Sequence, residues 1–136
     1  MAKMQSVSMQ VNNPGRSSRE DLNLTVGGTI VLTSQEVAKL VPGQLFRVKI
    51  TVMDDDTFSD DVVHTDTTFE RGVYDTTPTA FIVGVIVPAA KLRNSEPSYE
   101  SAAEIYCKVS AEHRNAQGRV IISTNTASTR TVAVRI

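Results

Sequence analysis

Apolar residues recur at every second position along several stretches of the chain, the spacing that places side chains on one face of a β-strand. Between these stretches lie clusters of glycine, proline, asparagine and aspartate, which are typical of turns. Valine, isoleucine and threonine are abundant, and they suit half-buried strands better than long helices. The alternating positions are Val7, Met9, Val11; Leu22, Leu24, Val26, Ile30, Leu32; Phe46, Val48, Ile50, Val52; Ile105, Cys107, Val109, Ala111; and Val132, Val134, Ile136.

Residues 81–88, FIVGVIVP, differ from the other stretches because they are apolar at successive positions. A strand with two apolar faces is typical of a central strand that is covered on both sides. We therefore expect residues 81–88 to lie inside a sheet, with protein packed against each face.

Two segments carry helical signals. Thr33 and Glu36 have the spacing of a capping box ahead of VAKLV, and Pro42 and Gly43 would end the helix. Residues 98–106, SYESAAEIY, combine alanine and glutamate with a later alternating pattern. We expect one short connector helix after Thr33, and a helical turn followed by a strand at 98–106.

About eight short strands separated by turns, with no internal repeat, predict an all-β fold. The expected architecture is an antiparallel β-sandwich of immunoglobulin-like or jelly-roll type with one short connector helix, its strand order left open. The tryptophan and disulfide of true immunoglobulin domains are absent. We divide the chain into an N-terminal arm at 1–21, comprising a first strand and a loop, and a single sandwich domain at 22–136.

Charge and composition narrow the possible partners. The formal net charge of the 136 residues is −1, and no dense basic stripe is present, which disfavours nucleic-acid and membrane binding. The single cysteine, Cys107, alternates in phase with Ile105 and Val109, so we expect a small buried apolar residue. The opening residues lack the apolar core of a signal peptide, which predicts a protein made in the cytoplasm.

Five aspartates fall within the stretch TVMDDDTFSDDVV. The run resembles the third calcium loop of C2 domains, in which a strand ends in two aspartates one residue apart and another follows a short loop. The resemblance implies a calcium-dependent binding module with Asp54, Asp56, Asp60 and Asp61 as ligands. The alternative is a solvated turn whose aspartates accept local backbone hydrogen bonds, and this is the interpretation we favour. No other cofactor is expected.

The sequence offers no catalytic signature. His64 lies two residues from Asp66, and His113 lies beside Glu112, but no nucleophile elbow, metalloprotease motif or phosphate loop accompanies them. We therefore expect a non-enzyme. A third alternative is a carbohydrate- or ligand-binding sandwich, which would use exposed loop aromatics. The candidates for that role are Phe58, Tyr74 and Tyr99.

The two ends of the chain carry strand-like sequences that could pair with another subunit. Terminal residues fray unless something holds them, and residues 1–21 are mostly polar. We expect Val7, Met9 and Val11 to form one contact with a neighbouring subunit, and Val132, Val134 and Ile136 to form a second.

A small cysteine-poor β-sandwich with such arms is similar to the cement or decoration proteins of bacteriophage capsids and to some tail proteins. The resemblance implies a structural virion protein that binds other subunits as a homo-oligomer, a capsid partner, or both.

Overall fold

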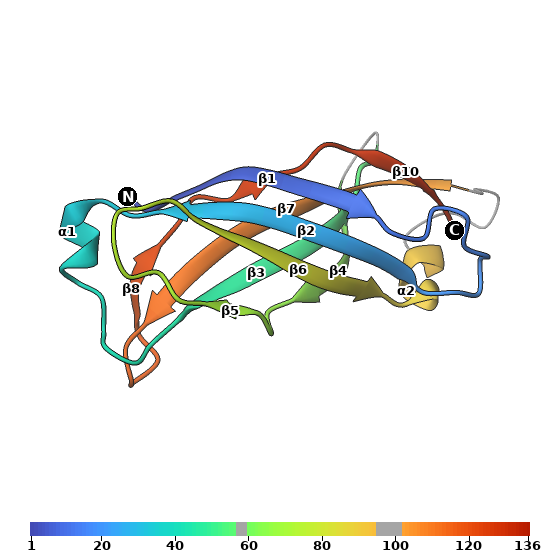
Figure 1. Ribbon diagram of the computed structural model, residues 1–136. Coiled ribbons are helices and arrows are strands. Elements are labelled where there is room, and N and C mark those ends of the chain that lie inside the picture. Colours follow the sequence, from blue (N-terminus) through green and yellow to red (C-terminus); the bar gives the residue numbers. More distant parts are fainter. Residues whose placement is uncertain (57–59, 95–101) are drawn as a thin grey trace.

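The computed structural model describes residues 1–56, 60–94 and 102–136 (Figure 1). Two antiparallel sheets pack face to face, which confirms the all-β sandwich. The smaller sheet has the order β1-β2-β6 and contains β1 (Lys3–Val11), β2 (Leu22–Val31) and β6 (Thr79–Val87). The larger sheet has the order β10-β7-β3-β4 and contains β10 (Val132–Arg135), β7 (Ala102–Arg114), β3 (Phe46–Asp54) and β4 (Asp61–Asp66). The short β5 (Glu70–Arg71) pairs with β3, and β8 (Val120–Ser123) and β9 (Ala127–Ser128) pair with β7.

The core lies between the two sheets and contains many of the residues that the alternating pattern singled out, together with Leu92 and the inward side chains of β6. In β7 every second side chain is buried, and β2 and β3 follow the same alternation except that Gly27 and Met53 are buried as well. Burial of a valine, leucine or isoleucine side chain contributes about 1.5–3 kcal/mol, so these three strands carry much of the stability. The largest fully buried apolar side chains are Phe46, Leu22, Leu24, Ile30, Ile50, Leu92 and Ile105.

β1 changes its inward face part-way along. Ala2 and Met4 are buried, whereas further on Val7, Met9 and Val11 are the residues that pack against the core. The change from even to odd positions requires an extra residue, and the β1–β2 register shifts between Gln5 and Ser8. Ser6 lies in this bulge and has a φ of 53°. Residues other than glycine adopt positive φ values only at an energetic cost.

β8, β9 and β10 run in succession along the same edge of β7. Where the ladder is interrupted, two threonines take its place. Thr124 and Thr129 each donate a backbone N–H to a β7 carbonyl, of Ala111 and Cys107 respectively, at 2.9 Å. Each hydroxyl accepts the N–H of the same β7 residue, also at 2.9 Å. Although the strand along this edge is interrupted, Thr124 and Thr129 therefore satisfy the main-chain N–H and C=O of Ala111 and Cys107 on β7.

The predicted connector helix is confirmed as α1 (Ser34–Val37), with both hydrogen bonds of the Thr33–Glu36 capping box in place. It ends at Val37, earlier than the predicted end at Pro42 and Gly43. A second helix, α2 (Ala89–Asn94), was not expected; the Asp21 carboxylate accepts the N–H of Ala89 at 3.0 Å. No described helix is long and apolar enough to cross a membrane. Residues 95–101, which include most of the expected helical turn, lie outside the described residues.

The prediction that residues 81–88 form a covered central strand is wrong. β6 pairs with β2 on one side only, and it forms the edge of the smaller sheet in Figure 1. Its inward residues, such as Val83 and Val85, are buried, but Ile82 and Ile86 point outward and are 73% and 60% exposed. The apolar outer face of β6 therefore remains uncovered by the described residues of this chain.

Candidate interaction surfaces

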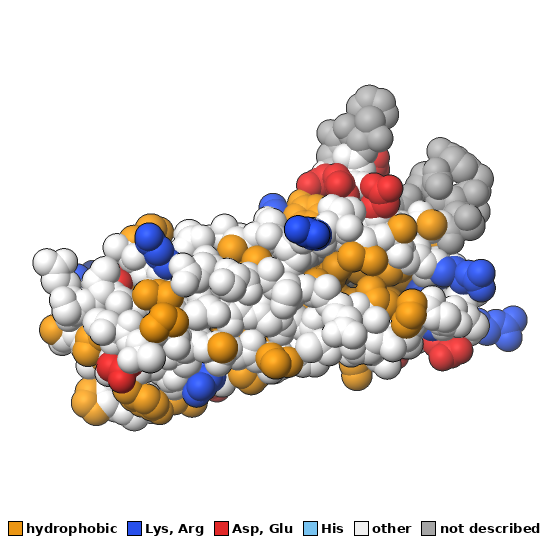
Figure 2. Space-filling view, turned by 45° about the horizontal axis from the view of Figure 1, so that its top comes forward, with side chains coloured by type: hydrophobic (Ala, Val, Ile, Leu, Met, Phe, Trp, Pro, Cys, Tyr) orange, Lys and Arg blue, Asp and Glu red, His pale blue; other side chains and the backbone are white. Residues whose placement is uncertain are grey.

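The outer face of the smaller sheet is almost free of charge. We use the term outer face for the outward-pointing side chains of β1, β2 and β6. Lys3, at one end, is its only ionisable member. Figure 2 shows this side of the molecule obliquely: it is mostly white and orange, and charged side chains gather toward the ends and margins. The remaining members are Gln5, Ser8, Gln10, Asn23, Thr25, Gly27, Thr29, Val31, Ala80, Ile82, Gly84 and Ile86.

The corresponding face of the larger sheet is charged. Arg47 lies opposite Glu112 on β7 and opposite Glu70 on β5. A hollow of about 300 Å³ on this face is lined in part by Arg47, Lys49 and Arg114. Glu112 pairs with Arg114 at 2.6 Å, so much of the local charge is balanced. Solvated charges of this kind keep a sheet surface in water, whereas the outer face of the smaller sheet lacks them.

The free edge of β6 is equally uncharged. Natural sheets protect their edges with short strands, charged side chains, proline or bulges. β6 is 9 residues long, has no charged residue and no proline, and keeps one continuous register with β2. By contrast, β4, the edge of the larger sheet, is 6 residues long and carries Asp61, His64 and Asp66. Among the edges in the described part of the chain, β6 is the least protected.

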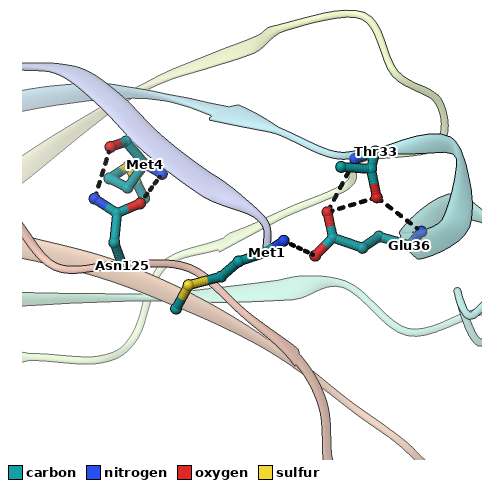
Figure 3. Close-up of polar contacts among 5 residues, drawn as sticks. All are labelled: Met1, Met4, Thr33, Glu36 and Asn125. Carbon is teal, nitrogen blue, oxygen red and sulfur yellow. Dashed lines mark hydrogen bonds and ion pairs between the residues drawn. The ribbon is translucent and has the colours of Figure 1, made fainter.

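The outer edge of β1 is used within the chain. Figure 3 shows the Asn125 side chain facing the Met4 backbone, where the amide accepts the Met4 N–H at 2.9 Å and donates to the Met4 carbonyl at 3.2 Å. Ala2 forms an isolated parallel bridge with Thr124. The Met1 amino group lies 3.9 Å from Glu36, the residue of the α1 capping box. The N-terminal segment is thus attached to both sheets.

The pKa of the Glu36 carboxyl lies below its ordinary value. Burial would raise it, but hydrogen bonds from Thr33, the nearby N-terminal charge and the Ala2 backbone together outweigh that effect. The ionised carboxylate therefore helps to hold the chain start.

Five of the six predicted subunit-contact residues pack against this chain's own core, and the sixth, Val132, is half-buried. The five are Val7, Met9, Val11, Val134 and Ile136. The sulfur atom of Met9 lies 3.4 Å from the sulfur atom of Cys107. Val134 is buried, and Ile136 packs against the core from the other end. Arg16, itself buried, donates to the carbonyl of Arg135 and so attaches the β1–β2 loop to β10. Pairing of these strands with another subunit stays a prediction, and their inward side chains already have partners.

The aspartates of the candidate calcium loop have different environments. Asp54 is fully buried at the end of β3, and neither carboxylate oxygen has a hydrogen-bond partner among the described residues. Asp60 accepts the Tyr106 hydroxyl and the Asp56 N–H. These contacts, the Tyr106 hydrogen bond first, lower the pKa of Asp60.

One contact is of the kind expected for a solvated turn, because the Asp56 N–H donates to the Asp60 carboxylate. Asp56 and Asp61 are exposed. Within residues 1–56, 60–94 and 102–136, no three His, Cys, Asp or Glu side chains are grouped as metal ligands. Calcium binding stays an untested alternative.

The two histidines have structural contacts. His113 is 1% exposed, stacks at 5.0 Å on Phe46, and accepts the Val41 N–H at its Nε2 at 2.9 Å. Burial lowers its pKa. His64 lies 3.1 Å from the Lys91 amine, and burial together with this positive charge lowers its pKa as well. The contacts of His113 join the segment after α1 to β7 and leave the ring inaccessible to a substrate.

Two further residues bear on the predictions. Cys107 is fully buried, which confirms the expected apolar role, and burial raises the pKa of its thiol to about 12. Of the three candidate aromatics for ligand binding, Tyr74 is 73% exposed, while Phe58 and Tyr99 lie outside the described residues.

The sequence did not single out Ile82, Gly84 and Ile86 as candidate contact residues, although the structure exposes all three on the outer face. Their signal was the double-faced apolar pattern of 81–88, which indicated covering protein without saying where it comes from.

No family model and no curated protein matches this chain. Among solved structures, the X-ray structure of Northeast Structural Genomics Consortium target SoR45 aligns over 98% of this chain and 84% of that one. The two share 8% sequence identity and a TM-score of 0.44. A similarity of this size indicates nothing about function.

Proposed function

We propose that this protein is a non-enzymatic structural protein that assembles with other protein subunits, with a virion component such as a capsid decoration or tail protein as the specific class. The observation that carries the proposal is the outer face of the smaller sheet, which has Lys3 as its only charged residue and continues to the unprotected edge of β6. Interface centres are depleted in charged residues relative to the rest of a protein surface. An exposed sheet face of this composition is therefore suited to contact with protein.

The contrast between the two sheets supports the same proposal. The larger sheet keeps arginine, lysine and glutamate on its outside, so one face is suited to water and the other to a partner. His113 is held in the core, and the Cys107 thiol is buried with a raised pKa, so neither supplies a reactive surface group.

Sedimentation of lysate from cells that make the protein tests the proposal. We expect the chain to travel in fractions far heavier than its 14.8 kDa. The double variant Gln5→Glu/Gln10→Glu puts two charges on the outer face at exposed positions of β1, and we expect it to remain in the light fractions.

Lys49→Glu is the matched control, because it changes net charge by the same amount on the larger sheet. It should sediment like the wild type. A wild-type chain confined to the light fractions contradicts the proposal.

A further inference from the structure

We propose that β6 pairs with β6 of a second copy of this chain, antiparallel and centred on Gly84, to join two smaller sheets into one. This inference rests on the proposed assembly function and names one partner for it. The two-fold symmetry of such a pair demands a surface that is complementary to itself.

The sequence of β6 is symmetric about Gly84. Reading outward in both directions gives valine at 83 and 85 and isoleucine at 82 and 86, so the segment is IVGVI. In an antiparallel pair centred on Gly84, Ile82 faces Ile86 of the second copy, and each valine faces the other valine. Both isoleucines are exposed in the single chain, and each would cover its counterpart on the outer face.

The main-chain groups of these residues point to the free side. Asn23 uses its N–H and C=O toward the β1 side, where Asn13 Oδ1 lies at 2.9 Å and the Asn12 N–H at 2.8 Å. Asn23 and Ile86, which lie opposite each other on β2 and β6, are therefore a non-hydrogen-bonded pair. The N–H and C=O of Ile86 make no hydrogen bond to β2. Since direction alternates along a strand, the N–H and C=O of Ile82, Gly84 and Ile86 all point away from β2.

The length of the free segment fits this register. At one end, the Ala80 carbonyl accepts the Arg71 side chain at 3.3 Å. At the other end, Pro88 has no N–H to donate. Between these limits, the three outward-directed residues would exchange about six main-chain hydrogen bonds with their counterparts. Gly84 brings no side chain to the two-fold axis, and the space around its Cα is open, with nothing within 4 Å of an added Cβ.

Partner choice follows from the same features. Any strand could form main-chain hydrogen bonds with this edge, so the side chains decide between partners. A charged strand would find no counter-charge on β6, whereas a second copy presents an isoleucine at each exposed isoleucine. Natural edge strands often carry charged side chains that repel a second copy and so prevent self-association. The edge of β6 carries no such charge.

Sedimentation equilibrium of the purified full chain tests the proposal. We expect the wild type to be dimeric, and Ile82→Lys to raise the dimer dissociation constant by roughly two- to thirtyfold, because it replaces both Ile82–Ile86 cross-strand pairs of the dimer. Val62→Lys, at an equally exposed apolar position of β4, is the control and should leave the constant unchanged.

The double variant Ile82→Lys/Ile86→Glu tests the register. Each lysine then faces a glutamate of the other copy, so we expect dimerisation to recover relative to either single variant. Circular dichroism and a thermal melt establish that each variant is folded. A monomeric wild type, or a double variant no better than the single ones, overturns the proposal.

The outcome is separable from that of the assembly function. A wild-type chain that is monomeric when purified but heavy in the lysate gradient refutes this pairing and leaves the assembly function standing. A purified dimer that never enters the heavy fractions of the lysate gradient supports this pairing and refutes the assembly function.

Discussion

Thr124 and Thr129 replace ladder bonds where the strand along β7 is interrupted, and their hydroxyls supply a measurable part of the stability. In the wild type, the Ala111 N–H donates to the Thr124 hydroxyl oxygen at 2.9 Å. Thr124→Val keeps the side-chain shape and the backbone N–H but removes this acceptor. Ala111 is buried, so its N–H would have no water to replace the hydroxyl. Leaving a buried donor unsatisfied costs roughly 1–3 kcal/mol.

The hydroxyl of Thr129 has the same role at the second site. Thr129→Val leaves the N–H of Cys107, a fully buried residue, without its acceptor at 2.9 Å, again for roughly 1–3 kcal/mol. The two threonines have no common hydrogen-bond partner on β7, so the double variant should lose the sum to within about 0.5 kcal/mol. For a domain of this size each loss lowers Tm by roughly 3–10 °C.

Urea denaturation followed by circular dichroism measures both losses. Thr131→Val, at an exposed position of the same segment, is the control and should stay within about 0.5 kcal/mol of the wild type. If Thr124→Val unfolds at the same urea concentration as this control, the hydroxyls do not substitute for the ladder and the reasoning fails.

Three further predictions concern single residues. Ser6→Gly should stabilise the fold by about 0.5–1 kcal/mol, measured by urea denaturation, because glycine adopts the positive φ of the bulge without strain; an unchanged midpoint would refute it. Asp54→Val should raise stability by roughly 1–4 kcal/mol, because it removes a buried carboxylate without a hydrogen-bond partner, and added calcium should leave the wild-type Tm unchanged; a calcium-dependent rise in Tm would instead favour the C2-like site. Burial lowers the pKa of His113, so the unfolded chain takes up its proton first and stability should fall as pH drops from about 7 to 5; His113→Gln should flatten that dependence in pH-resolved melts, and an identical slope would contradict it.

The sequence predicts those strands whose side-chain direction is decided by burial alone. Leu22 to Val26, Phe46 to Val52 and Ile105 to Ala111 alternate because one face meets the core and the other meets water, and the structure follows them. α1 is predictable for a related reason: both partners of its capping box lie within one turn, at Thr33 and Glu36.

Other elements depend on contacts between residues far apart in the sequence. The carboxylate that accepts the first N–H of α2 comes from Asp21, 68 residues away from Ala89. The switch of inward face in β1 depends on the bulge at Ser6. The apolar spacing does change from two to three between Met4 and Val7, but this change alone does not distinguish a bulge within one strand from the start of a new strand.

The sequence indicated that the outer side chains of β6 would be covered, but not by what. The two-faced apolar pattern of 81–88 indicated a strand covered on both sides, but the pattern cannot tell a second layer of the same chain from a second chain. The aspartate cluster shows the converse limit. Asp54 and Asp60 lie close in sequence, yet one faces the core and the other accepts the Tyr106 hydroxyl, because their directions depend on where β3 ends.

The most direct test of the account is a disulfide between two copies at Gly84. In the proposed register the two Gly84 Cα atoms lie about 5.5 Å apart, within the range that a disulfide spans. A side chain at Gly84 meets nothing within 4 Å, and the same holds for Gly15 in the β1–β2 loop, which makes Gly15→Cys the matched control.

After mild oxidation with copper phenanthroline at low protein concentration, we expect a covalent dimer for Gly84→Cys on non-reducing gels and a monomer for Gly15→Cys. Equal cross-linking of the two variants, or none at Gly84→Cys, would contradict the pairing of β6 with its own copy.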